Sequence, residues 1–128
     1  MPTDFIGLFA IMAVARVRFV LVGGLAQVLH GLDRLTAAVD LVIDLSAESA
    51  RHMQVFSFWD SANTRPTVDV LLAPPVPFED LWASASVMNI GGHEVRVASI
   101  EHLIRMKAAA GRAQDLADIE RLRARLEG

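Results

Sequence analysis

Short apolar runs that read as strands alternate along this chain with segments that read as helices, and this interleaving constrains the fold most. An apolar segment at 4–15 is followed by "RFVLVGG" at 18–24 and "LAQVLHG" at 25–31. A short β-branched run closed by glycines is typical of a buried strand. Interleaved elements of both kinds predict an α/β (α+β) domain, with helices packed on a mixed β-sheet.

The rest of the chain continues this alternation in one domain. Strands are predicted at 37–45 and 67–73, and a hairpin at 87–97 turns at the Gly-Gly pair "GG". Helices are predicted at 47–59, 78–85, 100–110 and 113–127. A chain of 128 residues is the length of one domain, so we expect a single domain over 1–128 with a C-terminal helical tail at 99–127.

The composition narrows the possible partners. The hydrophobic fraction is 53% and the mean hydropathy +0.39, compared with about 45–50% apolar residues in ordinary soluble domains. This surplus indicates apolar surface for a homodimer or a cognate partner protein, although an alanine-rich interior explains it equally well. With a net charge of −3, the global field does not attract nucleic acid.

Two features bear on the compartment. The chain has no cysteine, which excludes disulfide scaffolds and thiolate zinc sites and fits a cytoplasmic location. The longest apolar run, "FIGLFAIMAVA", is shorter than the roughly 20 residues that span a bilayer. Because Asp4 precedes it and no lysine or arginine does, it also lacks the start of a signal peptide. We expect a buried helix there and no membrane partner.

Three features along the chain point to a common site. Gly23 and Gly24 lie at a strand-to-helix junction, where a ligand can approach the backbone and meet free N–H groups. Asp40 and Asp69 lie inside two apolar strands, where a buried charge needs a cation, an ion pair or a solvent-filled cleft. If the two strands are neighbours, the aspartates can share Mg²⁺, as carboxylates do in nucleotidyl transfer.

The segment "VLVGGLAQVLHGLDRLTAAVDLVID" resembles the nucleotidyltransferase-fold family related to the AbiEii toxins and the minimal nucleotidyltransferases. That family reads approximately G-G-x-A-x-x-x-H-G-x-x-R-x-T-x-D-[IV]-D-L. The positions that match here are Gly23, Gly24, Ala26, His30, Gly31, Arg34, Thr36, Val39, Asp40 and Leu41. The resemblance continues in "TVDVLLA", which contains Asp69, and in "ASIEHLIRMKAAAGRAQDLADIERL". It extends from about Arg18 to Leu122.

The resemblance implies a nucleotidyltransferase-like sheet, a nucleoside triphosphate as substrate and Mg²⁺ as cofactor. It implies phosphate binding at Gly23 and Gly24, and Asp40 and Asp69 as catalytic carboxylates and metal ligands. Further candidates for nucleotide binding are Arg34, Thr36 and Lys107. Arg34 can instead be an ion-pair partner of Asp40 or Asp69, as can Arg65, and Lys107 can cap carbonyl groups at the end of its helix.

The chain departs from the family at Ala38, where the family has the first aspartate of its D-x-D. Losing one carboxylate from a two-metal site should remove at least one ion and the alignment of the reaction. Ala38 can be a substitution made in an active enzyme or a natural loss. One hypothesis is therefore a nucleotidyltransferase of impaired activity that transfers a nucleotide to a protein, RNA or small-molecule acceptor. The resemblance also implies a place in a toxin–antitoxin or defence pair. The alternative is a catalytically inactive module, either nucleotide-binding or antitoxin-like and regulatory.

Overall fold

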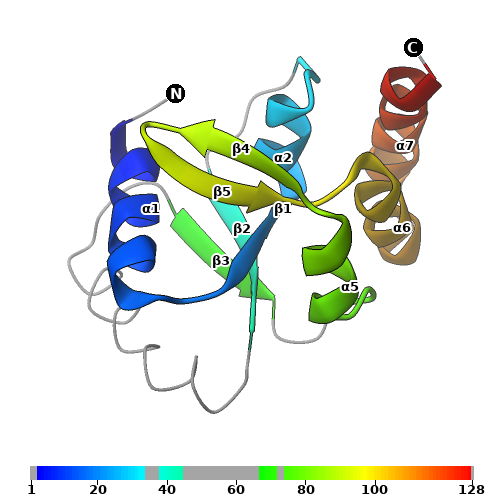
Figure 1. The fold of residues 1–128 in the computed structure, drawn as a ribbon. Helices are drawn as coiled ribbons and strands as arrows, with labels where there is room; N and C mark the ends of the chain where they lie inside the picture. Colours follow the sequence, from blue (N-terminus) through cyan, green and yellow to red (C-terminus); the bar gives the residue numbers. More distant parts are fainter. Residues whose placement is uncertain (1–2, 34–37, 45–66, 72–73, 128) are drawn as a thin grey trace.

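Ten helices and strands alternate along the part of the chain that the structure describes, as the sequence predicts (Figure 1). The structure is a computed structural model that describes residues 3–33, 38–44, 67–71 and 74–127. Its elements are α1 (Thr3–Ala15), β1 (Phe19–Val22), α2 (Gly23–Leu29), β2 (Ala38–Ile43), β3 (Thr67–Leu71), α5 (Phe78–Ser84), β4 (Ser86–Ile90), β5 (His93–Val97), α6 (Ile100–Ala110) and α7 (Ala113–Glu127). The α/β class is confirmed.

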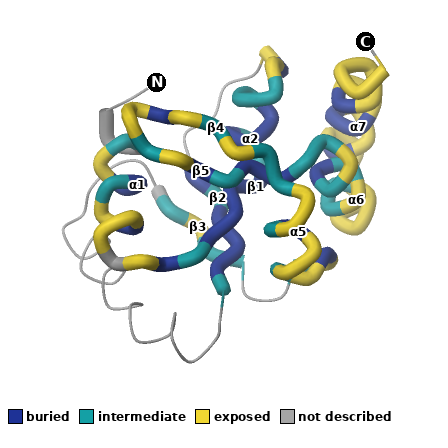
Figure 2. Tube along the Cα trace, in the orientation of Figure 1, coloured by how far each residue is buried: buried dark blue, intermediate teal, exposed yellow. Residues whose placement is uncertain are grey.

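The five strands form one mixed sheet in the order β3-β2-β1-β5-β4. β1 is antiparallel to β2 and parallel to β5, β2 is parallel to β3, and β4 and β5 form the hairpin. The predicted mixed sheet is therefore confirmed. Its central strand β1 is only four residues long and buried throughout, as Figure 2 shows. Because the strand is so short, other elements lie close to both of its ends.

Helices cover the sheet with large apolar side chains. α2 packs against β1 and β2, α5 against β1, α1 against β5, and α6 against α7. Phe9 of α1 stacks on Phe19 of β1 with ring centroids 6.0 Å apart. The largest fully buried side chains include Phe9, Met12, Leu21, Leu41, Leu81 and Leu122. Each contributes about 1.5–3 kcal/mol through burial, and together they hold the helices on the sheet.

α1 ends in a Schellman-type turn built on an unusual residue. The N–H of Val17 donates to the carbonyl of Met12, and that of Arg16 donates to the carbonyl of Ala13. Arg16 therefore occupies the left-handed position, with φ +59°, where glycine is the usual residue. A side chain there costs roughly 1–2 kcal/mol of backbone strain.

The predicted boundaries need small corrections. α2 begins at Gly23 rather than Leu25, so the Gly-Gly pair forms the first turn of the helix rather than a loop before it. β2 ends at Ile43, before Asp44, and the predicted last residues of β3, 72–73, lie outside the described residues. The helix predicted at 47–59 lies outside the described residues.

The C-terminal helices follow their sequence signals. The side chain of Ser99 caps α6 by accepting a hydrogen bond from the N–H of His102, and Gly111 ends the helix in the left-handed conformation. The hairpin turn has φ +60° at Gly91 and +87° at Gly92, as the Gly-Gly signal predicts. Within the described residues, no helix combines the length and hydropathy that crossing a bilayer requires.

Candidate functional site

A pocket of about 300 Å³ lies where the C-terminal end of β1 meets the first turn of α2, the middle of β2 and the junction between α6 and α7. Such a volume lies at the lower end of the range of small-molecule sites. The residues that line it are Val22, Gly23, Gly24, Gln27, Asp40, Leu71, Leu103, Met106, Lys107, Ala110, Arg112, Gln114 and Asp115. Four of the seven predicted site residues are in this lining.

Gly23 and Asp40 are in such close contact that only glycine fits at position 23. Val22 of β1 is paired with Asp40 of β2, which puts the next residue, Gly23, beside that aspartate. A Cβ atom on Gly23 would lie 2.1 Å from the Oδ2 atom of Asp40, and the φ of Gly23 is +70°. The strand-to-helix junction predicted at the glycines is therefore confirmed, and its geometry depends on the missing side chain.

The N–H of Gly24 donates a hydrogen bond to the carboxylate of Asp40. Val22, the residue before α2, offers no side-chain cap to the helix. Asp40 thus satisfies one of the free amides at the start of α2, from a neighbouring strand. This amide is one of those predicted to bind phosphate, so in this structure the protein's own carboxylate occupies it.

Asp40 and Asp69 lie side by side, as the sequence predicts. They are register partners in the parallel pair β2–β3, so they lie on one face of the sheet, and the protonated form of Asp40 donates a side-chain hydrogen bond to Asp69. Burial raises the pKa of Asp40 above its ordinary value, and the neighbouring charge of Asp69 raises it further. Lys107 and the Gly24 amide act in the opposite direction without cancelling the shift.

Two adjacent carboxylates that repel each other fit one divalent cation. Mg²⁺ needs only one or two protein carboxylates when water and substrate phosphates complete its six oxygen ligands. Among the described residues, no group of three or more carboxylate or imidazole side chains is placed to hold a metal ion. The donor set Asp40 and Asp69 therefore fits a single Mg²⁺ that a triphosphate helps to bind.

Position 38 lies on the same face as this pair. Ala38 begins β2 and is in register with Thr67 of β3, two residues before the pair Asp40–Asp69. Side chains two apart along a strand point to the same side, about 6–7 Å from each other. An aspartate at position 38 would thus be a third carboxylate on the face that carries the other two.

Lys107 lies on the pocket wall but its charge is already neutralised. Its ammonium group is 3.1 Å from a carboxylate oxygen of Asp115 and 3.0 Å from one of Asp118. Asp115 also accepts hydrogen bonds from the backbone and the guanidinium of Arg112. These contacts hold the pKa of Asp115 well below its usual range, led by the bond from Arg112. They favour a structural role for Lys107, while its predicted contact with a triphosphate stays a prediction.

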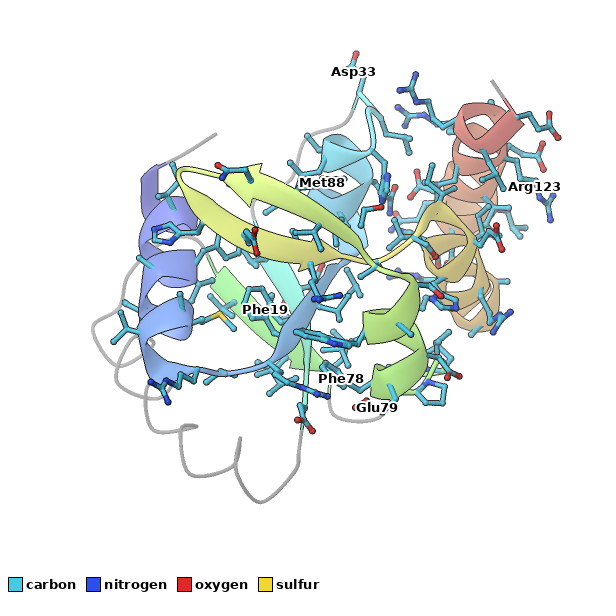
Figure 3. The ribbon with its side chains drawn as sticks, viewed as in Figure 1. Phe19, Asp33, Phe78, Glu79, Met88 and Arg123 are labelled. Atoms are coloured by element: carbon cyan, nitrogen blue, oxygen red, sulfur yellow. The ribbon has the colours of Figure 1, made fainter. Side chains whose placement is uncertain are left out.

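Arg34 and Thr36 lie outside the described residues, as does Arg65, so their predicted roles stay predictions. Hydrogen bonds join His30 and Asp33, which precede Arg34, to residues far away in the sequence. The Nε2 atom of His30 is 2.8 Å from the carbonyl oxygen of Ala98, and Arg125 donates to the carbonyl of His30. Arg121 donates in the same way to the carbonyl of Asp33, which is labelled in Figure 3 and is the last described residue before Arg34.

Two glutamines of the pocket, Gln27 and Gln114, are absent from the site residues that the sequence predicts. Gln27 is fully buried in α2, one turn after the Gly-Gly pair. The helical repeat from position 23 to 27 is a signal that could have identified it. No local pattern marks Gln114, because it reaches the pocket only through the packing of α7 against α6.

Comparison of the sequence with protein-family models and with curated proteins gives no match. Solved structures do resemble the fold. One is an antigenic nucleotidyltransferase-like protein from Paracoccidioides brasiliensis, at a TM-score of 0.66 and 19% identity over 90% of this chain and 71% of that one. Another is the lincosamide antibiotic adenylyltransferase LnuA with bound lincomycin, at a TM-score of 0.65 and 16% identity over 96% of both chains. The chain therefore has a nucleotidyltransferase-like fold.

Proposed function

We propose that this protein binds a nucleoside triphosphate together with one Mg²⁺ ion in the pocket at Gly23, and that nucleotidyl transfer is impaired by Ala38. The observation that carries the proposal is the Asp40–Asp69 pair on the sheet face beside the Gly23 turn. Two like charges held together, one of them in the lining of a pocket, are stabilised by a cation, and the fold is one that nucleotidyltransferases use. The acceptor class, whether protein, RNA or a small molecule, stays open.

Each element has a defined task in this proposal. Asp40 and Asp69 hold the ion, which when bound neutralises phosphate charge and orients the attacking oxygen. The remaining free amides in the first turn of α2 face the phosphates. The ion pairs of Lys107 fix the wall formed by α6 and α7. With alanine at position 38, a second ion lacks a ligand, so we expect binding with slow or absent transfer.

Isothermal titration with ATP, GTP, CTP and UTP, each with and without Mg²⁺, tests the binding. We expect at least one nucleotide to bind only with the metal. Asp40→Asn and Asp69→Asn should each weaken that binding by at least about tenfold. Asp80→Asn, which changes an exposed aspartate in the first turn of α5, is the matched control and should leave it unchanged. Failure of all four nucleotides to bind would remove the nucleotide proposal.

Restoring the missing carboxylate tests the impairment separately. Ala38→Asp should produce transfer of radiolabelled nucleotide to material in a host extract, while the unsubstituted chain gives little or none. Binding without transfer in both chains would leave a nucleotide-binding module. Transfer by the unsubstituted chain at the same rate would show that position 38 is not limiting.

A second candidate, a protein-interaction module, is favoured by the apolar outer surface of α1. Val14 is 86% exposed and Ile11 39%, and Gly7 has open space beside it on the same side of the helix. A helix that stays apolar on its solvent side is typical of an interface. The homodimer or cognate partner, the toxin–antitoxin role and the cytoplasmic location belong to this proposal. Light scattering of Val14→Glu beside the unsubstituted chain tests it, because a monomer in both would exclude the homodimer.

A further inference from the structure

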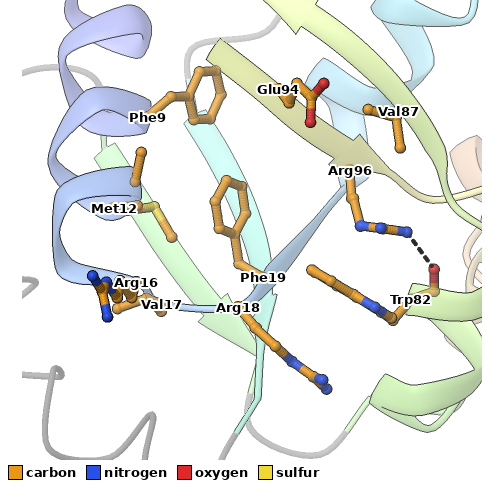
Figure 4. Close-up of a pocket in the computed structure, with 11 residues that line it drawn as sticks. Phe9, Met12, Arg16, Val17, Arg18, Phe19, Trp82, Val87, Glu94 and Arg96 are labelled. Atoms are coloured by element: carbon orange, nitrogen blue, oxygen red, sulfur yellow. Dashed lines mark hydrogen bonds between the residues drawn. The ribbon is translucent and has the colours of Figure 1, made fainter.

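A second hollow, of about 410 Å³, lies at the opposite end of β1 from the Gly23 pocket (Figure 4). It is bounded by the C-terminal part of α1, the start of β1, α5 and the β4–β5 hairpin. The linings of the two pockets share no residue. A ligand here would therefore not occupy the carboxylate site.

Aromatic and apolar side chains make up much of the wall of this hollow. Phe9 and Phe19 stack on each other, and Met12 lies beside them in Figure 4. The indole of Trp82 forms another part of the wall. Aromatic side chains in the wall of a cavity of this size suit a planar ligand of one or two rings.

The positive charge in this hollow comes from the guanidinium groups of arginine side chains. Arg96 stacks on Trp82, with its central carbon 4.0 Å from the ring centroid, and it donates one hydrogen bond to the carbonyl of Trp82. Within the described residues Arg96 has no carboxylate partner, so most of its five donors have no acidic acceptor. Arg18 lies near the same indole but is neutralised by Asp44 and Glu79.

The position of the single carboxylate gives the hollow a polarity. Glu94 lies towards Phe9 and Val87, away from the end where Arg96 meets Trp82 (Figure 4). Arg16 at the rim also has no ion-pair partner in the described part of the chain. The chain as a whole is acidic, with a net charge of −3. The guanidinium groups of Arg16 and Arg96 would therefore attract an anion to this hollow although the whole protein repels anions.

Arg16 adds an independent observation. It occupies a left-handed backbone position at which glycine is the residue that fits without strain. Strained backbone conformations cluster at functional sites, so a charged side chain held in one at the edge of a cavity indicates a function.

We propose that this hollow is a binding site for a small aromatic carboxylate, with the ring against Phe19 and the carboxylate on the guanidinium of Arg96. A planar guanidinium can bind a carboxylate through two parallel hydrogen bonds while its face remains stacked on the indole. The proposal is independent of nucleotide binding at the Gly23 pocket.

Titration with naphthoate tests the site in the full chain, observed by fluorine NMR after labelling with fluorotryptophan. The chain has two tryptophans, Trp59 and Trp82, so a Trp59→Phe background leaves one resonance, that of Trp82. We expect naphthoate to shift this resonance in a saturable manner. Neutral naphthol should bind at least tenfold more weakly, and acetate and inorganic phosphate, which have no ring, should not compete at equal concentration.

Three variants identify the residues involved. Arg96→Gln should weaken naphthoate binding at least tenfold, whereas Arg123→Gln, on the outer surface of α7 in Figure 3, should leave it unchanged. Val87→Phe, which fills the hollow without changing its charge or adding a tryptophan, should also abolish binding and covers the case in which Arg96→Gln unfolds the protein. Equal binding of naphthol, or equal weakening by Arg123→Gln, would overturn the proposal.

Discussion

The contact between Gly23 and Asp40 leads to a quantitative prediction for Gly23→Ala. The new methyl group would lie 2.1 Å from Oδ2 and 2.9 Å from Cβ of Asp40, so rotation of the carboxylate alone cannot make room. Alanine at φ +70° costs roughly 1–2 kcal/mol. Displacing Asp40 also breaks the charged hydrogen bond from Gly24, worth about 1.5–3 kcal/mol. The free energy of unfolding should therefore fall by about 2.5–5 kcal/mol.

Urea unfolding followed by circular dichroism measures this loss, and the chain offers a matched control. Gly92 has φ +87° but nothing near its missing side chain, so Gly92→Ala should cost only the backbone strain of roughly 1–2 kcal/mol. In an Asp40→Gly background the effect of Gly23→Ala should shrink towards that value, because the carboxylate and the Cβ atom of residue 40 are already gone. A Gly23→Ala loss within roughly 0.5 kcal/mol of the Gly92→Ala loss would refute the reasoning.

Three further predictions concern stability. Asp40→Asn should raise the free energy of unfolding at pH 7, because burial and Asp69 raise the pKa of Asp40. Since both folded and unfolded chains are protonated below about pH 3.9, the gain should vanish there in a urea series across pH. Asp115→Asn should cost about 2–3 kcal/mol at neutral pH through weakened bonds to two cations, compared with at most about 1 kcal/mol for the exposed Glu120→Gln. Because contacts lower the pKa of Asp115, its loss should diminish as pH falls through the ordinary aspartate range, and a constant difference would contradict the assignment. Arg16→Gly should raise the melting temperature by relieving roughly 1–2 kcal/mol of strain, and an unchanged or lower value would argue against strain at that turn.

Much of the fold follows from local signals in the sequence. The Gly-Gly hairpin, the cap at Ser99 and the end of α6 at Gly111 each depend on neighbours along the chain, and all three are confirmed. The pairing of Asp40 with Asp69 was inferred from two charges in apolar strands, and the parallel register of β2 and β3 confirms their position.

What the sequence did not predict depends on packing between distant segments. The bond from Gly24 to Asp40 joins a helix start to the neighbouring strand, and no spacing rule identifies such a pair. Gln114 reaches the pocket only because α7 packs against α6. The hollow around Trp82 combines four separate segments, so its arginines appear in the sequence only as scattered surface charges.

The C-terminal helices also determine what the smallest independent folding unit is. A segment that reads in the sequence as an appended tail contributes part of the pocket wall through Asp115. It also holds the segment before β2 through Arg121 and Arg125. A chain shortened to end at Ala110 would therefore not be a trimmed domain but an incomplete one, with an open pocket and an exposed core face where Leu122 packs.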